Sequence, residues 1–144
     1  MTSTTLPATS RPLPAWVVPT VITILRVAAG LMFMQHGAQK LFGVLGGVDG
    51  AGASVPLASL MGFGGVVEFF GGLLVALGLF TRPVAALAVV QMIAAYFMAH
   101  APQGGLPVQN QGELALLYAA VFAALVGLGA GPWSLDAVLF DRKR

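Results

Sequence analysis

The residues with the most chemical potential in this chain are ionisable side chains that lie inside long apolar segments. Arg26 and Glu68 are the two clear cases, because mostly apolar residues and glycines flank each of them on both sides. A charged side chain in the middle of a membrane span costs at least about 2.5 kcal/mol to insert, so such residues are usually paired and often functional. Because their depths are similar, an ion pair between Arg26 and Glu68 is the structural interpretation that we predict.

Further polar side chains extend this set toward one end of the apolar segments. Counted at about 1.5 Å per residue from the helix ends, several lie about 6 to 12 Å deep and the others lie near the surface. They predict a polar funnel that opens on the outer side, with its floor near Arg26. Lys40, His100 or Glu113 alone would be interpreted as an interface residue whose charged end reaches water. The complete set of candidate binding residues is Arg26, His36, Lys40, Glu68, Tyr96, His100 and Glu113, with Tyr118 as a possible addition.

A histidine and a tyrosine beside a carboxyl group fit the two carbonyl groups of a quinone. An imidazole exchanges protons near neutral pH, so such a site could also relay the protons of the quinone. A metal site is not predicted, because no HxxxH or ExxH pair occurs on one predicted helix. The chain has no cysteine, which excludes disulfides, iron-sulfur clusters and thiolate metal sites. A quinone is thus compatible with these residues, although the spacing alone does not require one and the sequence demonstrates no cofactor.

The elements that position these residues are predicted to be membrane-spanning helices. Of the 144 residues, 58% are hydrophobic and 8% are charged, whereas a soluble domain is about a quarter charged. A bilayer core about 30 Å thick needs roughly 20 apolar residues per helix. We predict an all-α polytopic membrane protein, a bundle of four transmembrane helices that forms one domain over residues 16–130, with spans at about 16–42, 60–80, 83–100 and 111–129.

The remaining segments are predicted as tails and connections. Residues 1–15 are rich in Ser, Thr and Pro and indicate a disordered tail without a signal peptide. Residues 131–144 indicate a short interfacial helix anchored by Trp133, followed by a basic tail. The Gly-rich, apolar loop 43–59 could fold back onto the membrane, and the sequence leaves this open. The net charge of +2 is small and comes partly from basic residues at the C-terminus, so it does not indicate nucleic-acid binding.

Positive charge defines the expected orientation. Lys and Arg residues collect at the two termini and at the turn near residue 82, whereas the opposite loops have only Lys40 at a helix end. Since cytoplasmic loops carry the excess of Lys and Arg, both termini are predicted to be cytoplasmic.

The third predicted helix places Tyr96 and His100 on one face, and Gln91 is expected to point elsewhere. Glycines around Glu68 allow the close approach of a neighbouring helix.

Several motifs along the chain resemble the DoxX family. They are LRVAAGLMFMQHGAQKLF at residues 25–42, EFFGGLL at 68–74, GLFTR at 78–82, His100 at the end of the third predicted span, and GPWSLD at 131–136. The resemblance implies a four-helix bundle in the bacterial cytoplasmic membrane, linked to quinone-dependent oxidation of sulfur compounds, to oxidative-stress defence or to soluble redox enzymes. The positions that it implies as site residues are Arg26, His36, Lys40, Glu68 and His100. The absence of cysteine argues against the thiol oxidation used by related membrane families.

Two functions remain as the main alternatives. In the first, the protein is a quinone-linked redox subunit, and if it is an enzyme we expect a subunit of a quinone-linked oxidoreductase. In the second, it is a non-catalytic membrane anchor or assembly subunit whose polar residues only hold the bundle together. A carrier is a distant third, because neither an inverted repeat nor broken helices are evident. The expected partners are the lipid bilayer, further copies of the chain, and membrane or redox proteins.

Overall fold

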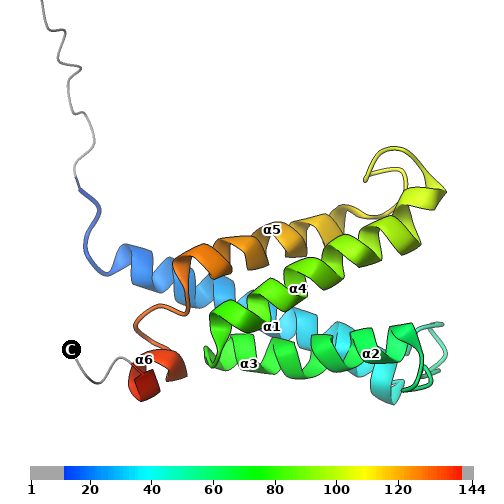
Figure 1. Ribbon diagram of the computed structural model, residues 1–144, viewed down its shortest axis with the longest axis horizontal. Helices are drawn as coiled ribbons and strands as arrows, with labels where there is room; N and C mark the ends of the chain where they lie inside the picture. The colour runs from blue at the N-terminus through cyan, green and yellow to red at the C-terminus, as the bar shows by residue number, and fades with distance from the viewer. Residues whose placement is uncertain (1–11, 141–144) are drawn as a thin grey trace, which may run out of the picture.

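The computed structural model describes residues 12–140, and within this range the chain is built from helices and contains no strand (Figure 1). Residues 1–11 of the predicted tail 1–15, and residues 141–144 of the predicted C-terminal segment 131–144, lie outside the described residues. The helices are α1 (Val17–Phe42), α2 (Leu60–Val66), η1 (Val67–Gly71), α3 (Gly72–Leu77), α4 (Thr81–Ala95), η2 (Tyr96–His100), η3 (Ala101–Gln103), α5 (Glu113–Leu128) and α6 (Leu135–Phe140). The predicted all-α membrane bundle is confirmed.

Three continuous helical rods are long and apolar enough to cross a membrane, namely Val17–Phe42, Leu60–Leu77 and Thr81–Gln103. The fourth, α5, is also apolar but has 16 residues, which makes it about 24 Å long at 1.5 Å per residue. The second rod ends at Leu77 because Gly78 adopts a left-handed φ of 70° and closes the helix. A helix at the position predicted for the C-terminal interfacial helix is present as α6.

Glycines bring α1 close to the rod formed by α2, η1 and α3. A methyl group on Gly30 would lie 2.6 Å from the backbone nitrogen of Ala76 and 2.7 Å from the carbonyl oxygen of Gly72. A methyl group on Gly37 would collide with the backbone of Gly65 and Phe69 in the same way. This packing of small residues is typical of membrane helices, and it holds Glu68 opposite the C-terminal half of α1.

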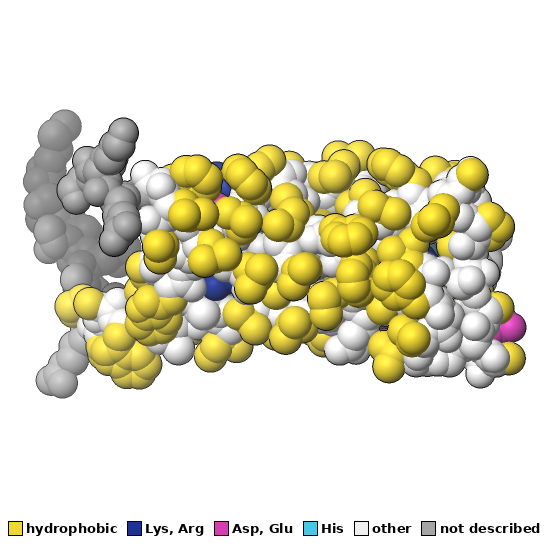
Figure 2. Space-filling view, turned by 90° about the horizontal axis from the view of Figure 1, so that it is seen from below, with side chains coloured by type: hydrophobic (Ala, Val, Ile, Leu, Met, Phe, Trp, Pro, Cys, Tyr) yellow, Lys and Arg dark blue, Asp and Glu magenta, His cyan; other side chains and the backbone are white. Residues whose placement is uncertain are grey.

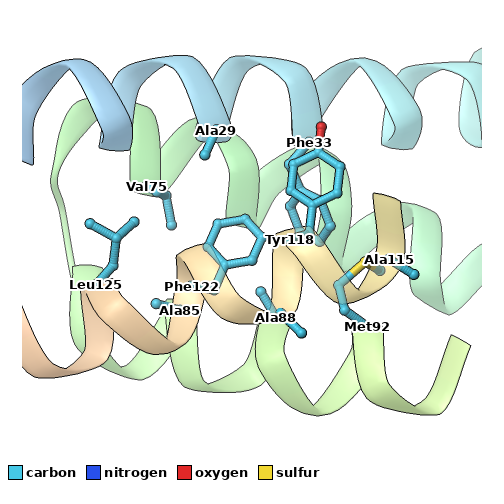
Figure 3. Close-up of a cluster of buried hydrophobic side chains, with 11 residues drawn as sticks. Ala29, Phe33, Val75, Ala85, Ala88, Met92, Ala115, Tyr118, Phe122 and Leu125 are labelled. Carbon is cyan, nitrogen blue, oxygen red and sulfur yellow. The ribbon is translucent and has the colours of Figure 1, made fainter. Parts of the chain in front are cut away.

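An apolar core fills the middle of the bundle (Figure 3). Phe33 of α1 packs edge-on against Phe122 of α5 with ring centroids 4.8 Å apart, and Tyr118 stacks on Phe122 at 5.8 Å. Val75 and Leu125 lie at one end of this core, and Met92 and Ala115 lie at the other (Figure 3). The core therefore separates the polar groups at the two ends of the bundle.

The outside of the bundle is also apolar. Figure 2 shows hydrophobic side chains spread over most of the visible face, with few charged groups among them. Large side chains on the long helices are exposed, including Ile24 at 63%, Val90 at 66% and Leu117 at 61%. An outer surface of this composition is suited to contact with lipid rather than water.

The loop between α1 and α2 folds onto itself. The Asp49 carboxylate accepts hydrogen bonds from the backbone nitrogens of Ala51, at 2.9 Å, and Ala53, at 3.0 Å. These donors, Ala53 first, hold the pKa of Asp49 below its ordinary value. The backbone nitrogen of Val55 donates to the carbonyl oxygen of Lys40 at 2.8 Å. The loop is thus attached to the end of α1.

Candidate functional site

Arg26 binds backbone carbonyl groups at one end of the bundle. It is 2% exposed, and its Nη1 atom donates to the carbonyl oxygens of Val75, at 2.9 Å, and Ala76, at 2.5 Å. Its Nη2 atom donates to the carbonyl oxygen of Trp133 at 2.9 Å. The last carbonyl groups of a helix lack partners within that helix, and a cation is favourable there. Arg26 therefore closes the C-terminal end of α3.

Asp136 completes the same end. Its carboxylate accepts hydrogen bonds from the backbone nitrogens of Phe80, at 2.7 Å, and Thr81, at 3.0 Å, which are among the unpartnered donors at the start of α4. Its own backbone nitrogen donates to the carbonyl oxygen of Gly78 at 2.8 Å. We call these contacts of Arg26 and Asp136 the Arg26 junction. Figure 1 shows that the turn between α3 and α4 and the start of α6 meet at this end.

The predicted ion pair between Arg26 and Glu68 is wrong. Glu68 is 2% exposed, and its Oε1 atom forms an ion pair with the Nζ atom of Lys40. The same oxygen accepts a hydrogen bond from Nε2 of Gln91 at 2.9 Å. Similar depth did not imply contact, because Arg26 extends toward the carbonyl groups at the end of α3 whereas Glu68 has a cation on the last turn of α1.

The expectation that Gln91 points away from the other polar residues is also wrong. Its Nε2 atom contacts both Glu68 and the carbonyl oxygen of Gly64, the latter at 3.1 Å. The reason is that α4 packs against α5 on one side and against η1 on the other. Two faces of α4 are therefore inside the bundle, and a residue off the Tyr96 face can still point inward.

A cavity of about 240 Å³ opens beside Glu68, and we call it the Glu68 cavity. Its wall combines polar groups from α1, η1, η2, the following loop and α5 with an apolar lining. The polar residues are His36, Lys40, Glu68, His100, Gln111 and Tyr118, and the apolar residues are Phe33, Met92, Ala95, Leu114 and Ala115. Segments that are distant in the sequence thus meet at one site.

The carboxylate of Glu68 has one oxygen in use and one without a partner. Lys40 and Gln91 both donate to Oε1, while Oε2 is buried and no donor among residues 12–140 reaches it. A buried acceptor without a donor is unfavourable, and such groups merit a functional explanation. The unsatisfied oxygen belongs to a residue in the wall of a cavity that could admit a ligand.

Two aromatic residues and a second histidine complete the polar wall. The His36 and Tyr118 rings meet edge-on, with centroids 5.9 Å apart. The Nδ1 atom of His100 lies 3.0 Å from the carbonyl oxygen of Asn110. Glu68 and His100 both lie in π-helical turns, η1 and η2. Such turns are rare and frequently occur at functional sites.

Four of the seven predicted binding residues line this cavity: His36, Lys40, Glu68 and His100. The other three lie elsewhere. Arg26 lies in the junction and does not form the floor of a funnel. The hydroxyl group of Tyr96 accepts a long hydrogen bond of 3.5 Å from Asn110, outside the cavity wall, and Glu113 is exposed at the start of α5.

Sequence reasoning missed Gln91 and Gln111. A glutamine inside an apolar span was a usable signal for Gln91. Gln111 precedes α5 in a loop, with a positive φ of 58°, and helical periodicity cannot place a loop residue.

Among residues 12–140, no group of three or more His, Asp or Glu side chains is arranged to hold a metal ion.

A larger groove of about 470 Å³ lies beside the Arg26 junction. Its charged side chains already bind the backbone. Asp136 caps α4, and Nη1 of Arg82 donates to the carbonyl oxygen of Val126 at 2.7 Å. The charged groups in this groove have structural partners, so the smaller Glu68 cavity is the candidate functional site.

Comparisons with known proteins agree with the fold and with the motifs. A protein of Haemophilus influenzae, described as uncharacterized, is 39% identical over 127 residues, which cover 86% of this chain and 94% of that protein. A protein of Mycobacterium tuberculosis, described as an uncharacterized membrane protein, is 33% identical in an alignment 157 positions long, gaps included, which covers 99% of this chain and 94% of that protein. No solved structure matches the chain. The DoxX family model matches residues 21–101, a segment that begins before Arg26 and ends after His100. This membrane protein belongs to the DoxX family.

Proposed function

We propose that the protein is a redox-linked membrane subunit that binds the head group of a quinone in the Glu68 cavity. The observation that supports this proposal most is the buried Glu68 carboxylate, which has an unpartnered oxygen and shares a cavity wall with two histidines and a tyrosine. A bound quinone would supply a couple that carries two electrons and two protons. A partner oxidoreductase would exchange the electrons.

The residues of the cavity suit such a head group in polarity. Phe33, Met92 and Leu114 provide apolar and aromatic surface for the ring. His36 and Tyr118 can donate hydrogen bonds to ring oxygens, and an imidazole exchanges protons near neutral pH. Lys40 and Gln91 fix the Glu68 carboxylate, so that its second oxygen is held in place for a ligand.

Photoaffinity labelling tests this proposal directly. A quinone that carries an azido group on its ring should label segments 33–40 and 92–100 of the purified protein, and excess unlabelled quinone should suppress the labelling. His36→Ala should reduce the labelling strongly, because it removes a polar wall residue. Tyr96→Phe is the matched control and should leave the labelling unchanged, since the Tyr96 hydroxyl group lies outside the cavity wall.

Two results would overturn the quinone site. One is labelling that is spread over the lipid-facing side chains and resists competition. The other is equal labelling of the wild type and His36→Ala. Either result would leave the non-catalytic anchor as the better description of the protein.

We further propose that the protein lies in the bacterial cytoplasmic membrane with both termini inside. The Glu68 cavity then occupies the outer half of the bundle, because it lies at the end opposite the turn that contains Arg82. A reporter enzyme that is active only outside the cytoplasm should work when fused within loop 101–110 and should fail when fused after Arg144. The reverse pattern would place the cavity in the cytoplasmic half.

A further inference from the structure

We infer that the Glu68 cavity binds the reduced, hydroxyl-bearing form of its ligand, the quinol, in preference to the oxidised quinone. The inference deepens the function proposed above and rests on it. The two forms differ at the ring oxygens, which are hydroxyl groups in the quinol and carbonyl groups in the quinone. A hydroxyl group can donate a hydrogen bond, whereas a carbonyl group can only accept one.

The hydrogen bonding of Glu68 favours the reduced form. The ammonium group of Lys40 and the amide group of Gln91 both donate to Oε1. This arrangement suits an ionised carboxylate, which accepts at both oxygens and is balanced by the neighbouring cation. The remaining oxygen, Oε2, is buried and receives no donor from the described part of the chain.

A ligand next to Oε2 of the ionised carboxylate must donate a hydrogen bond to it. A quinol hydroxyl group would satisfy this oxygen and recover the free energy lost by a buried, unpaired acceptor. A quinone carbonyl group in the same place would bring two acceptor oxygens together without a proton between them. The oxidised form would thus leave the carboxylate unsatisfied and add repulsion.

The tautomer of His100 also favours the reduced form. Its Nδ1 atom lies 3.0 Å from the carbonyl oxygen of Asn110. A carbonyl oxygen only accepts, so Nδ1 carries the proton and donates it. In the neutral ring, Nε2 is then an acceptor. The residues of the cavity wall thus offer two acceptor atoms, Oε2 of Glu68 and Nε2 of His100. A quinol has two hydroxyl groups that can donate to such acceptors, whereas a quinone has none.

The other polar groups of the wall do not reverse this preference. The tyrosine hydroxyl of Tyr118, the amide of Gln111 and the imidazole of His36 can each donate or accept, so they accommodate either form of the ligand. Lys40 donates only, but it is directed to Glu68. Discrimination between the two forms therefore depends mainly on the Glu68 carboxylate.

Affinity measurements on the full-length protein in detergent test the inference. Decylubiquinone and its reduced form, decylubiquinol, should be compared without oxygen. We expect the wild type to bind the reduced form at least tenfold more tightly. Glu68→Gln replaces the acceptor with an amide that can also donate, so the preference should disappear or reverse. Tyr96→Phe, which changes a residue outside the cavity wall, should keep the wild-type preference.

A second measurement needs no variant and decides the question even if Glu68→Gln does not fold. A tenfold preference for the reduced form raises the midpoint potential of the bound two-electron couple by about 30 mV. Redox titration of the ligand bound to the wild type should show a shift of this sign and at least this size. An unchanged or lower potential, or equal affinities for the two forms, would overturn the inference and leave the quinone site intact. Failure of both forms to bind would overturn the proposed function as well.

Discussion

The two ends of the bundle both bury charge, but they use it differently. At the Arg26 junction, the guanidinium group donates to three carbonyl oxygens and the Asp136 carboxylate accepts from two backbone nitrogens. Nε of Arg26 and the hydroxyl group of Thr81 lack hydrogen-bond partners among residues 12–140, but Arg26 itself lines neither the groove nor the Glu68 cavity. At the other end, Glu68 has an unpartnered oxygen and lies in a cavity wall.

The difference shows that burial of charge is not by itself a sign of function in a membrane helix. Arg26 has a structural task, because its buried side chain satisfies the carbonyl groups at the end of α3. Glu68 has partners for only half of its carboxylate, beside space that a ligand could fill. We therefore expect substitutions in the junction to change stability and substitutions in the cavity to change ligand binding.

The largest effect is expected at Arg26. Arg26→Met removes the charged donors of three hydrogen bonds and leaves the carbonyl groups of Val75, Ala76 and Trp133 without them. We expect a loss of about 3 kcal/mol or more in unfolding free energy, since hydrogen bonds to charged groups contribute about 1.5 to 3 kcal/mol each. Denaturant unfolding in detergent measures this loss.

Arg26→Lys is the control for charge. It should be intermediate in stability, because an ammonium group lacks the planar fork that reaches several carbonyl groups. If Arg26→Met changes the free energy of unfolding by less than about 0.5 kcal/mol, it behaves as an ordinary surface substitution, and Arg26 does not have the structural role described here.

The next effect concerns the partner of Glu68. Lys40→Met and Glu68→Gln should each destabilise the protein, and the double variant should lose clearly less than the sum. We expect a coupling free energy of about 1 to 3 kcal/mol, because the two side chains form an ion pair. The same cycle with Arg26→Lys and Glu68→Gln should be additive within about 0.5 kcal/mol. Coupling between Arg26 and Glu68, or none between Lys40 and Glu68, would reverse the assignment of partners.

A smaller effect is expected at Asp136. Asp136→Ala removes the acceptor for the backbone nitrogens of Phe80 and Thr81 at the start of α4. Loss of an N-terminal cap costs about 1 kcal/mol, and up to about 2 kcal/mol in strong cases. Thermal unfolding should show this decrease, with Glu113→Ala, an exposed residue of α5, as the comparison. Equal stabilities of the two variants would argue against a capping role.

The smallest effect concerns the loop at the cavity end. Backbone donors, chiefly Ala53 and then Ala51, lower the pKa of Asp49 in the folded protein. Their stabilising effect is therefore present above the ordinary Asp pKa of about 3.9 and is lost as the pH falls through the lower folded value. Hydrogen-exchange protection of the Ala51 and Ala53 amides should decline over that acidic range. In Asp49→Ala, the protection of these two amides should be low at every pH. If their protection in the wild type does not depend on pH, the Asp49 carboxylate does not hold the loop.

The sequence predicted the helices well because their signal is local. Long apolar runs between Gly, Pro and polar residues identify spans in any arrangement of the bundle. Some ends differ by a few residues, and backbone geometry explains them. Gly78 closes the second rod before the predicted end, and α4 begins at Thr81 because Asp136, distant in the sequence, caps it there.

The site was harder to predict because its contacts depend on how helices pack. Depth along a helix placed Arg26 and Glu68 at similar levels but gave no information on direction or on competing partners. A single inward face was assumed for the third span, whereas α4 has neighbours on two sides, which is why Gln91 was misplaced. His36 and Lys40 were placed well because both lie near the end of the regular helix α1, where depth and face together restrict the position.

We expect the Glu68 cavity to determine ligand binding and the Arg26 junction to determine stability. Two matched substitutions, Glu68→Gln and Asp136→Asn, each change a carboxylate to an amide at one end of the bundle. A ligand that binds only the folded protein raises its melting temperature, so the shift produced by decylubiquinol measures binding in each variant. We predict a shift equal to that of the wild type in Asp136→Asn, although its starting melting temperature is lower, and a much smaller shift in Glu68→Gln. A full shift in Glu68→Gln, or an equal loss in both variants, would contradict this expectation.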